Sequence, residues 1–344
     1  MKRRIWMVSW YGTCAGGLER IVMMLNQVLA DQYDVQVVDI PYVSGYGFLK
    51  KAVQINNRIC RMIIFSLFTK WISKKGDIII THGQNAPFLK SDFLFDHGSI
   101  CSLKREMGEF IYGGSTVFEY IAVKKTKCNV AVSQWTRKQI AHNYHIAKED
   151  IIVLENCIDT DVFFPIAHCN RTRFTILFCG RLEPAKGLSL LLKLAKCVEE
   201  QTEFELRIAA NDSSNTELFI GRRNIKVECA VSIDKMNDFY NSGDVLFVPS
   251  RCEGFGMGIV EALAVGIPVL THNVGIVEEL ITEKCPGIYV MPHEIDANNI
   301  LAEIPSIIGE NRKMNKRLDM HLYIKEHYGV KKYQKKVLSL LESV

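Results

Sequence analysis

The sequence predicts an α/β protein with two doubly wound parallel sheets, each covered by helices on both faces. Along the chain, short apolar runs rich in β-branched residues, typical of buried parallel strands, alternate with longer segments of helical period. Alternation at this spacing indicates βαβ units and therefore parallel sheets. The length of 344 residues suits about two domains, each able to bury its own core.

The first domain begins with a strand over Arg4–Ser9, a glycine loop at 11–17 and a helix over 18–30. Backbone amides at Gly16 and Gly17 can approach a ligand because neither residue carries a side chain. Further strands are expected at 34–40, 77–81, 93–96, 129–132 and 151–154. Ser133 is a suitable N-cap for the helix that follows the fifth strand.

The second domain repeats this alternation. Strands are expected at 174–179, 204–209, 225–228, 245–248, 268–271 and 288–291, with helices between them and a last amphipathic helix over 331–341. We therefore predict an N-terminal domain over 1–160, a C-terminal domain over 171–322, and a terminal helical segment over 323–344.

The composition is that of an ordinary soluble protein, with 23% charged and 48% apolar residues. No apolar run reaches the roughly 18 residues of a membrane span, and the apolar run after the basic start is too short for a secretory signal. The eleven cysteines are scattered without metal-site spacing, which favours a reducing cytoplasm over disulfides or zinc.

Positive charge is concentrated in the N-terminal half. Residues 1–165 hold 20 Lys and Arg against 15 Asp and Glu, a balance of +5 within a total of +4. This is too weak for nucleic-acid binding but fits a protein that touches an anionic membrane surface. The segment Lys50–Lys75 reads as one basic amphipathic helix, which suits either the headgroup region of a membrane or an ordinary crossover between strands.

The stretch from Val248 to Leu280 reads as strand, glycine loop, helix and strand. A loop of this kind leaves backbone N–H groups at a helix N-terminus for a phosphate or a sugar hydroxyl. Glu253 and Glu261 lie eight residues apart in it. Carboxylates only accept hydrogen bonds, so Glu261, inside the helix, suits ribose hydroxyls and Glu253 suits those of a sugar. The alternative for each glutamate is a solvated charge at a helix end.

A second stretch, from Phe174 to Leu192, runs from an apolar strand into Arg181, a turn at Pro184 and Lys186. Two cations five residues apart across a turn can converge on one diphosphate and stabilise the charge that develops as a bond to it breaks. They lie at the carboxyl end of a strand, where open α/β sheets bind ligands. The alternative is two ordinary surface charges.

With these residues in place, the sequence resembles the retaining glycosyltransferases of family 4, which have the GT-B fold. The resemblance rests on GR at 180–181, PAKG at 184–187 and PSRCEGFG at 249–256 with the second glutamate after it. It extends over nearly the whole chain, through GGLE at 16–19, AVSQWTRKQI at 131–140 and ENCIDTDVF at 155–163. It implies two Rossmann-like domains facing each other across a cleft, with the last helix crossing back to the first.

The resemblance implies a retaining hexosyltransferase that moves a sugar from a nucleoside diphosphate donor, such as a UDP-sugar, to a glycan hydroxyl. The residues expected to bind the donor are Gly16, Gly17, Arg181, Lys186, Glu253, Phe255, Gly256, Met257 and Glu261, and the catalytic ones are Glu253, His97, Arg181 and Lys186. No metal or other cofactor is expected. Asp159 and Asp161 form a DxD that we interpret as a turn at the domain junction, where Cys157 replaces the glycine usual in the family.

The family's common use in bacteria favours an acceptor in the cell envelope, such as lipopolysaccharide core, O-antigen or capsule, made by a cytoplasmic enzyme peripheral on the inner face of the inner membrane. A GT-B epimerase or hydrolase and an inactive nucleotide-sugar-binding homologue remain alternatives. So does an NAD-dependent oxidoreductase, because Asp39 follows Gly17 by the 22 residues of a dinucleotide fingerprint. The sequence lacks the GxGxxG motif of such oxidoreductases, however, and this hypothesis gives Arg181 and Lys186 no role.

Overall fold

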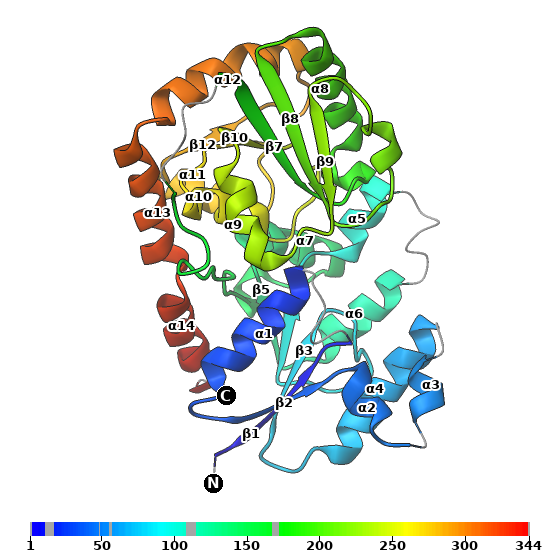
Figure 1. The fold of residues 1–344 in the computed structure, drawn as a ribbon. Helices are drawn as coiled ribbons and strands as arrows, with labels where there is room; N and C mark the ends of the chain where they lie inside the picture. The colour runs from blue at the N-terminus through cyan, green and yellow to red at the C-terminus, as the bar shows by residue number, and fades with distance from the viewer. Residues whose placement is uncertain are drawn as a thin grey trace. The chain divides into compact units, whose positions relative to one another are not determined.

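The computed structural model describes residues 2–10, 17–47, 49–54, 57–107, 115–166 and 172–342. The chain forms two compact units, Met1–Asn156 with Tyr333–Val344 (unit 1) and Cys157–Lys332 (unit 2). Each unit is built on its own six-stranded parallel sheet with helices around it, as the alternation of apolar runs predicted (Figure 1).

The sheet of unit 1 has the strand order β2-β1-β3-β4-β5-β6. Its strands are β1 (Arg4–Val8), β2 (Asp34–Val38), β3 (Ile78–His82), β4 (Phe93–Asp96), β5 (Cys128–Ala131) and β6 (Ile151–Val153). Its helices are α1 (Gly17–Leu29), α2 (Ile40–Ser44), α3 (Lys50–Gln54), α4 (Arg58–Ile72), α5 (Ile100–Met107), α6 (Ser115–Lys125) and α7 (Gln134–Tyr144). The last helix, α14 (Val330–Glu342), contacts this unit where Gln334 Nε2 donates to the carbonyl of Val28 in α1 at 3.0 Å.

The prediction of a single helix over 50–75 is wrong, because the described residues form two helices there, α3 and α4. The side chain of Asn57 accepts hydrogen bonds from the amides of Ile59 and Cys60 and so starts α4 as a separate helix. The inner face of α4 packs in the core of unit 1, with Phe65 and Phe68 beside Trp6 and Trp10. As the connection between β2 and the parallel strand β3, α4 is a crossover helix.

Asp39 has a local structural role. Its carboxylate accepts a hydrogen bond from the amide of Tyr42 at 2.8 Å and caps α2. The acidic residue of the dinucleotide fingerprint is therefore occupied in helix capping, which weakens the oxidoreductase alternative.

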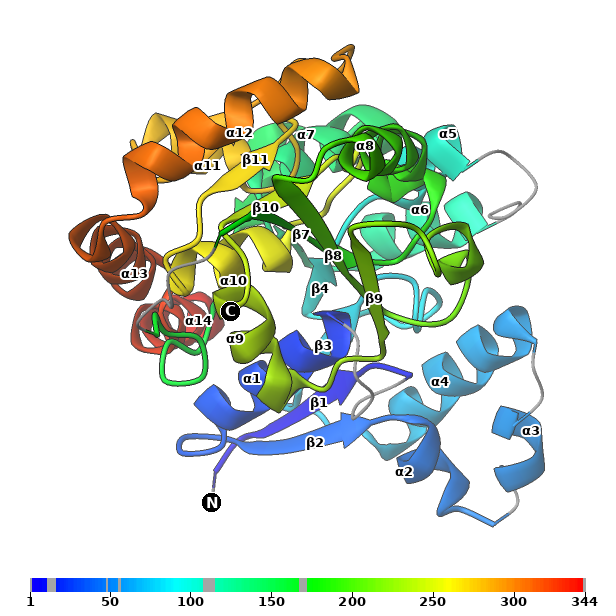
Figure 2. The same cartoon turned by 45° about the horizontal axis from the view of Figure 1, so that its top comes forward.

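The sheet of unit 2 has the strand order β12-β11-β10-β7-β8-β9. Its strands are β7 (Phe174–Gly180), β8 (Phe204–Ala210), β9 (Ile225–Cys229), β10 (Val245–Val248), β11 (Val269–Thr271) and β12 (Ile288–Val290). Its helices are α8 (Leu188–Glu200), α9 (Ile233–Asn241), α10 (Met257–Ala264), α11 (Val277–Thr282), α12 (Ala297–Asn311) and α13 (Met314–Tyr328). Helices α8 and α12 pack together over the main apolar cluster, and α10 packs against α13 (Figure 2).

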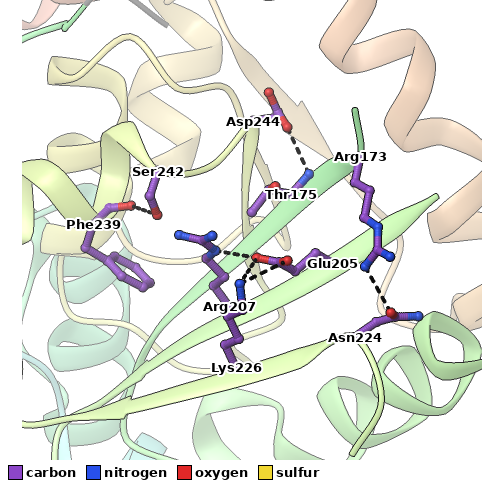
Figure 3. Close-up of polar contacts among 9 residues, drawn as sticks. All are labelled: Arg173, Thr175, Glu205, Arg207, Asn224, Lys226, Phe239, Ser242 and Asp244. Carbon is purple, nitrogen blue, oxygen red and sulfur yellow. Dashed lines mark hydrogen bonds and ion pairs between the residues drawn. The ribbon is translucent and has the colours of Figure 1, made fainter. Parts of the chain in front are cut away.

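Polar contacts fix the central strands of unit 2 (Figure 3). Asp244, buried just before β10, accepts a hydrogen bond from the amide of Thr175 in β7 at 2.8 Å. Glu205 on β8 binds Arg207 on the same strand and Lys226 on β9, at 2.5 and 3.3 Å. These contacts therefore tie the amino ends of β7, β8, β9 and β10 together, at the edge of the sheet opposite the turn after β7.

Asp159 and Asp161 form a turn, because Asp159 Oδ1 accepts a hydrogen bond from the amide of Asp161 at 3.0 Å. The described residues contain no group of three or more His, Cys, Asp or Glu arranged to hold a metal ion. Nor does any helix among them have both the length and the apolar character needed to cross a bilayer.

Candidate active site

The turn after β7 carries Arg181 and Lys186 and packs directly on the end of β10. Pro184–Lys186 form a short 3-10 helix, and Gly187, at φ +79°, starts α8. A Cβ atom on Gly187 would lie 2.1 Å from the carbonyl oxygen of Pro249. Glycine at this position therefore allows the Lys186 turn to approach the loop that carries Glu253.

Lys186 and Glu253, predicted from two separate motifs, form an ion pair. Lys186 Nζ lies 2.7 Å from Glu253 Oε1, and the Ser250 hydroxyl donates to the same oxygen at 2.8 Å. The two side chains are 21% and 13% exposed, so water screens the pair only in part. The sequence placed both residues in one site but did not predict that they pair. An ammonium has three N–H donors, so this contact leaves donors that can be directed to a ligand.

Arg181 has a carboxylate partner that the sequence reading missed. Its Nη2 atom lies 3.0 Å from Glu183 Oε1, and the arginine side chain is 47% exposed. The pKa of nearby Asp212 is lowered, mainly by hydrogen bonds from Ser214 and in smaller part by the charge of Arg181. Arg181 thus lies at the solvent-facing side of the turn, where Glu183 orients its guanidinium.

The loop after Glu253 is clamped before it enters α10. Gly256, at φ +92°, is the N-cap, and Met257 is the first residue of the helix. The carbonyl of Phe255 accepts a hydrogen bond from the amide of Ile276 at 2.8 Å, and a Cβ atom on Gly275 would lie 2.4 Å from that carbonyl oxygen. Phe255 is buried, so what it can offer a ligand is its backbone.

Glu261 is not a solvated charge, because its side chain is only 2% exposed inside α10. The hydroxyl of Tyr240 donates to Glu261 Oε2 at 2.7 Å. Burial raises the pKa of Tyr240 well above its usual value, so the hydroxyl remains a donor. Sequence reasoning missed Tyr240, because it lies on the buried face of α9, and nothing in the spacing to Glu261 indicates contact.

His97 in unit 1 follows β4 and contacts a second histidine. Its Nε2 lies 2.9 Å from Nδ1 of His82 at the end of β3, and the two rings stack at 5.1 Å. Burial lowers the pKa of His97 to about 4 and that of His82 well below its usual value. Both imidazoles are therefore neutral at pH 7, and one donates to the other. Gly17 is the first residue of α1, and Gly16 lies outside the described residues.

Unit 1 also buries two carboxyl groups, those of Glu119 and of Asp96, the residue before His97. The pKa of Glu119 is raised to about 7 by burial, although its carboxylate accepts hydrogen bonds from Tyr144 and from the amide of Ile100. Burial also raises the pKa of Asp96, and the charge of Glu119 adds to this. Below pH 7 both carboxyls favour the protonated form, so the interior of this region then carries less negative charge than its sequence implies.

Comparison with known proteins agrees with the fold and with the motifs. The family model of the glycosyl transferases group 1 matches residues 160–327, almost the extent of unit 2. An uncharacterized glycosyltransferase of Methanocaldococcus jannaschii is 34% identical over 245 residues, which are 66% of this chain and 62% of that protein. An uncharacterized 41.2 kDa protein in the cps region of Klebsiella pneumoniae is 30% identical over 191 residues, 53% of this chain and 52% of that one. The matched part of this chain thus spans less than two thirds of the length of these two relatives.

Solved structures with the same two-sheet organisation cover almost the whole chain. Sucrose-phosphate synthase from Thermosynechococcus elongatus aligns with a TM-score of 0.78 at 15% identity, over 99% of both chains. Anabaena HepE, solved in complex with UDP-glucose, aligns with a TM-score of 0.74 at 17% identity, over 99% of this chain and 100% of that one. WaaG, a glycosyltransferase involved in lipopolysaccharide biosynthesis, aligns with a TM-score of 0.74 at 16% identity, over 98% and 99%.

These neighbours define the class of the fold as GT-B, as the sequence predicted. Residues 160–327 match the family model of the glycosyl transferases group 1, and this matched region contains Arg181, Lys186, Glu253 and Glu261.

Proposed function

We propose that this protein is a retaining hexosyltransferase of the family 4 type. It would transfer a sugar from a nucleoside diphosphate donor, most simply a UDP-sugar, to a hydroxyl of a glycan. The observation that carries the proposal is the 2.7 Å pair of Lys186 and Glu253 at the carboxyl ends of β7 and β10, beside the N-terminus of α10. Anionic phosphates and sugar hydroxyls are the ligands that these groups suit together.

Each residue has a distinct part in this proposal. Lys186 and Arg181 bind the donor diphosphate and stabilise its charge as the glycosidic bond breaks, which requires no metal or other cofactor. Glu261, held by Tyr240, accepts hydrogen bonds from the ribose. Glu253 and the amides of Phe255, Gly256 and Met257 bind the sugar, and His97, Gly16 and Gly17 contribute from unit 1.

The ion pair with Lys186 also links Glu253 to binding of the donor diphosphate. Without a donor, Lys186 and Glu253 neutralise one another, and a bound diphosphate competes with Glu253 for the same ammonium. The freed carboxylate oxygen can then accept a sugar hydroxyl. Donor binding and sugar recognition would thereby be coupled through one lysine, so Glu253 contributes most when diphosphate and sugar are present together.

The acceptor we propose is a glycan of the bacterial envelope: lipopolysaccharide core, O-antigen or capsule. This is supported by the similarity to WaaG and to the protein of the cps region. We further propose a cytoplasmic enzyme that is peripheral on the inner face of the membrane, with the basic N-terminal half in contact with anionic lipid and no role for nucleic acid.

The test is thermal unfolding with UDP, GDP, UDP-sugars, GDP-mannose or NAD, followed by analysis of the products. A ligand at a hundredfold excess over its Kd stabilises the native state by about 2.7 kcal/mol. We expect a shift with one nucleotide diphosphate and its sugar. A shift with NAD alone would reject the proposal. Rapid loss or inversion of the donor sugar without acceptor would instead indicate the hydrolase or epimerase.

A further inference from the structure

Helix α4 carries a continuous apolar ridge on its outer face. Its members are Ile59, Ile63, Leu67 and Trp71, which are 49%, 41%, 63% and 65% exposed. Residues four apart are neighbours on a helix, so the four side chains form one row about 18 Å long. We call this row the α4 ridge. The opposite face of α4 is buried in unit 1, so this helix is apolar on both sides.

The ridge has four members and no acidic residue in its segment, whereas α13 carries a shorter row of the same spacing, Met314, Leu318 and Leu322, beside Asp319. A helix that only covers a sheet presents polar residues to water, as α14 does with the exposed side chains of Lys331, Lys332, Lys335 and Lys336. Single exposed apolar residues are ordinary, but an aligned row on one helix marks a contact surface. Figures 1 and 2 both show α4 at the periphery of unit 1, with α2 and α3 beside it.

Both ends of the ridge are basic. Arg58 is the first residue of α4, and Lys50 and Lys51 are the first residues of α3, which packs against α4. Lys70, Lys74 and Lys75 lie at and just after the end of α4, and all six side chains are exposed. The sequence contains no Asp or Glu from residue 40 to residue 76. The surface around the ridge therefore carries positive charge that no acidic residue of this segment offsets.

We propose that the α4 ridge lies flat in the headgroup region of an anionic lipid bilayer. The apolar row would enter the boundary with the acyl chains, while the lysines at both ends extend to lipid phosphates. Trp71, at one end of the row, has the amphipathic ring that membrane interfaces favour. A second copy of this chain fits the face less well, because two ridges in contact would bring two sets of cations together. The inference refines the proposed membrane contact to one helix face and does not depend on sugar transfer.

The test is co-sedimentation of the full chain with two kinds of vesicle, phosphatidylglycerol mixed with phosphatidylcholine, and phosphatidylcholine alone. We expect binding to the anionic vesicles only. Replacing Lys70, Lys74 and Lys75 together by Gln should weaken binding on the order of a hundredfold, since a basic residue near an anionic surface contributes about fivefold. Leu67→Gln with Trp71→Gln should weaken it at least about tenfold.

The matched control is Ile220→Gln with Ile233→Gln, which removes two exposed apolar side chains, 64% and 45% exposed, from unit 2. These should not change vesicle binding. Trp71 provides a direct readout because, among the four tryptophans in the described residues, it is exposed, whereas Trp135 is half-buried and Trp6 and Trp10 are buried. Its fluorescence should shift to the blue with anionic vesicles, and Trp71→Phe should abolish the shift.

Three results would overturn the inference: no binding to anionic vesicles, binding that the ridge variants leave unchanged, or self-association that Leu67→Gln abolishes in the absence of lipid. UDP binding without vesicles is measured on the same variants. Ridge variants should retain it, and a wild-type protein that binds vesicles but no nucleotide would refute the transferase while leaving the ridge in place.

Discussion

Replacement of Gly187 by Ala tests how the Lys186 turn is held. A Cβ atom at this position would lie 2.1 Å from the carbonyl oxygen and 2.6 Å from the carbonyl carbon of Pro249. Both are backbone atoms, so no side-chain rotation relieves the overlap. Overpacking of this kind costs about 1–3 kcal/mol, and an L-residue at φ +79° costs about 1–2 kcal/mol more. Gly187→Ala should therefore destabilise unit 2 by about 2–5 kcal/mol.

Gly221 provides the matched control. It has the same φ of +79°, but nothing lies within 4 Å of the position its Cβ would take. Gly221→Ala should therefore show the conformational cost alone, about 1–2 kcal/mol. The assay is urea unfolding of both variants followed by circular dichroism, with UDP titrated into each. Gly187→Ala should also bind UDP more weakly. If it is no less stable than Gly221→Ala, the turn does not pack on β10 as described.

Three further predictions concern other parts of the site. Tyr240→Phe removes the hydrogen bond to buried Glu261, which should cost about 1–3 kcal/mol of UDP affinity by calorimetry. Tyr289→Phe, whose hydroxyl binds Glu310 and Asn311 instead, should leave UDP affinity unchanged. Because the folded-state pKa of His97 is about 4, below the ordinary 6.5, its neutral form stabilises the fold above pH 6.5, and this stability is lost as pH falls toward 4. His97→Asn should flatten that part of a urea-stability profile. Glu119 changes the free energy of unfolding with pH in the opposite direction. Its folded-state pKa of about 7 gives stability that is complete below pH 4.5 and is lost as pH rises through 7. Glu119→Gln should remove that loss.

The strands could be predicted because short apolar runs rich in β-branched residues are typical of buried parallel strands. The apolar run over 174–179 was predicted as a strand, and the structure places β7 over Phe174–Gly180. The sequence analysis was wrong where a single polar side chain determines the local structure. Asn57 starts a new helix inside a segment that otherwise has the character of one amphipathic helix. Asp39 has dinucleotide spacing but is used as a cap.

The sequence names candidate site residues one by one, but it does not predict the contacts between them. Motif positions bring Lys186 and Glu253 to the same edge of the sheet, yet the distance between them depends on Gly187 and Pro249, which a sequence does not place in contact. The partners Glu183 and Tyr240 were missed for the same reason. Side-chain pairs across elements are set by tertiary packing, and a single sequence shows only spacing along the chain.

The central claim is that Lys186 binds the donor diphosphate directly, and isothermal titration of UDP tests it most directly. Lys186→Ala should weaken UDP binding by about 1.5–3 kcal/mol, on the order of ten- to a hundredfold, whereas Lys193→Ala, an exposed lysine of α8, should have no effect. Lys186→Ala also leaves Glu253 without its cation, so the deciding measurement is the double variant with Glu253→Gln. If Lys186 contacts the diphosphate, the double variant remains weak. If it regains wild-type affinity, the lysine only neutralises Glu253 and the claim is wrong.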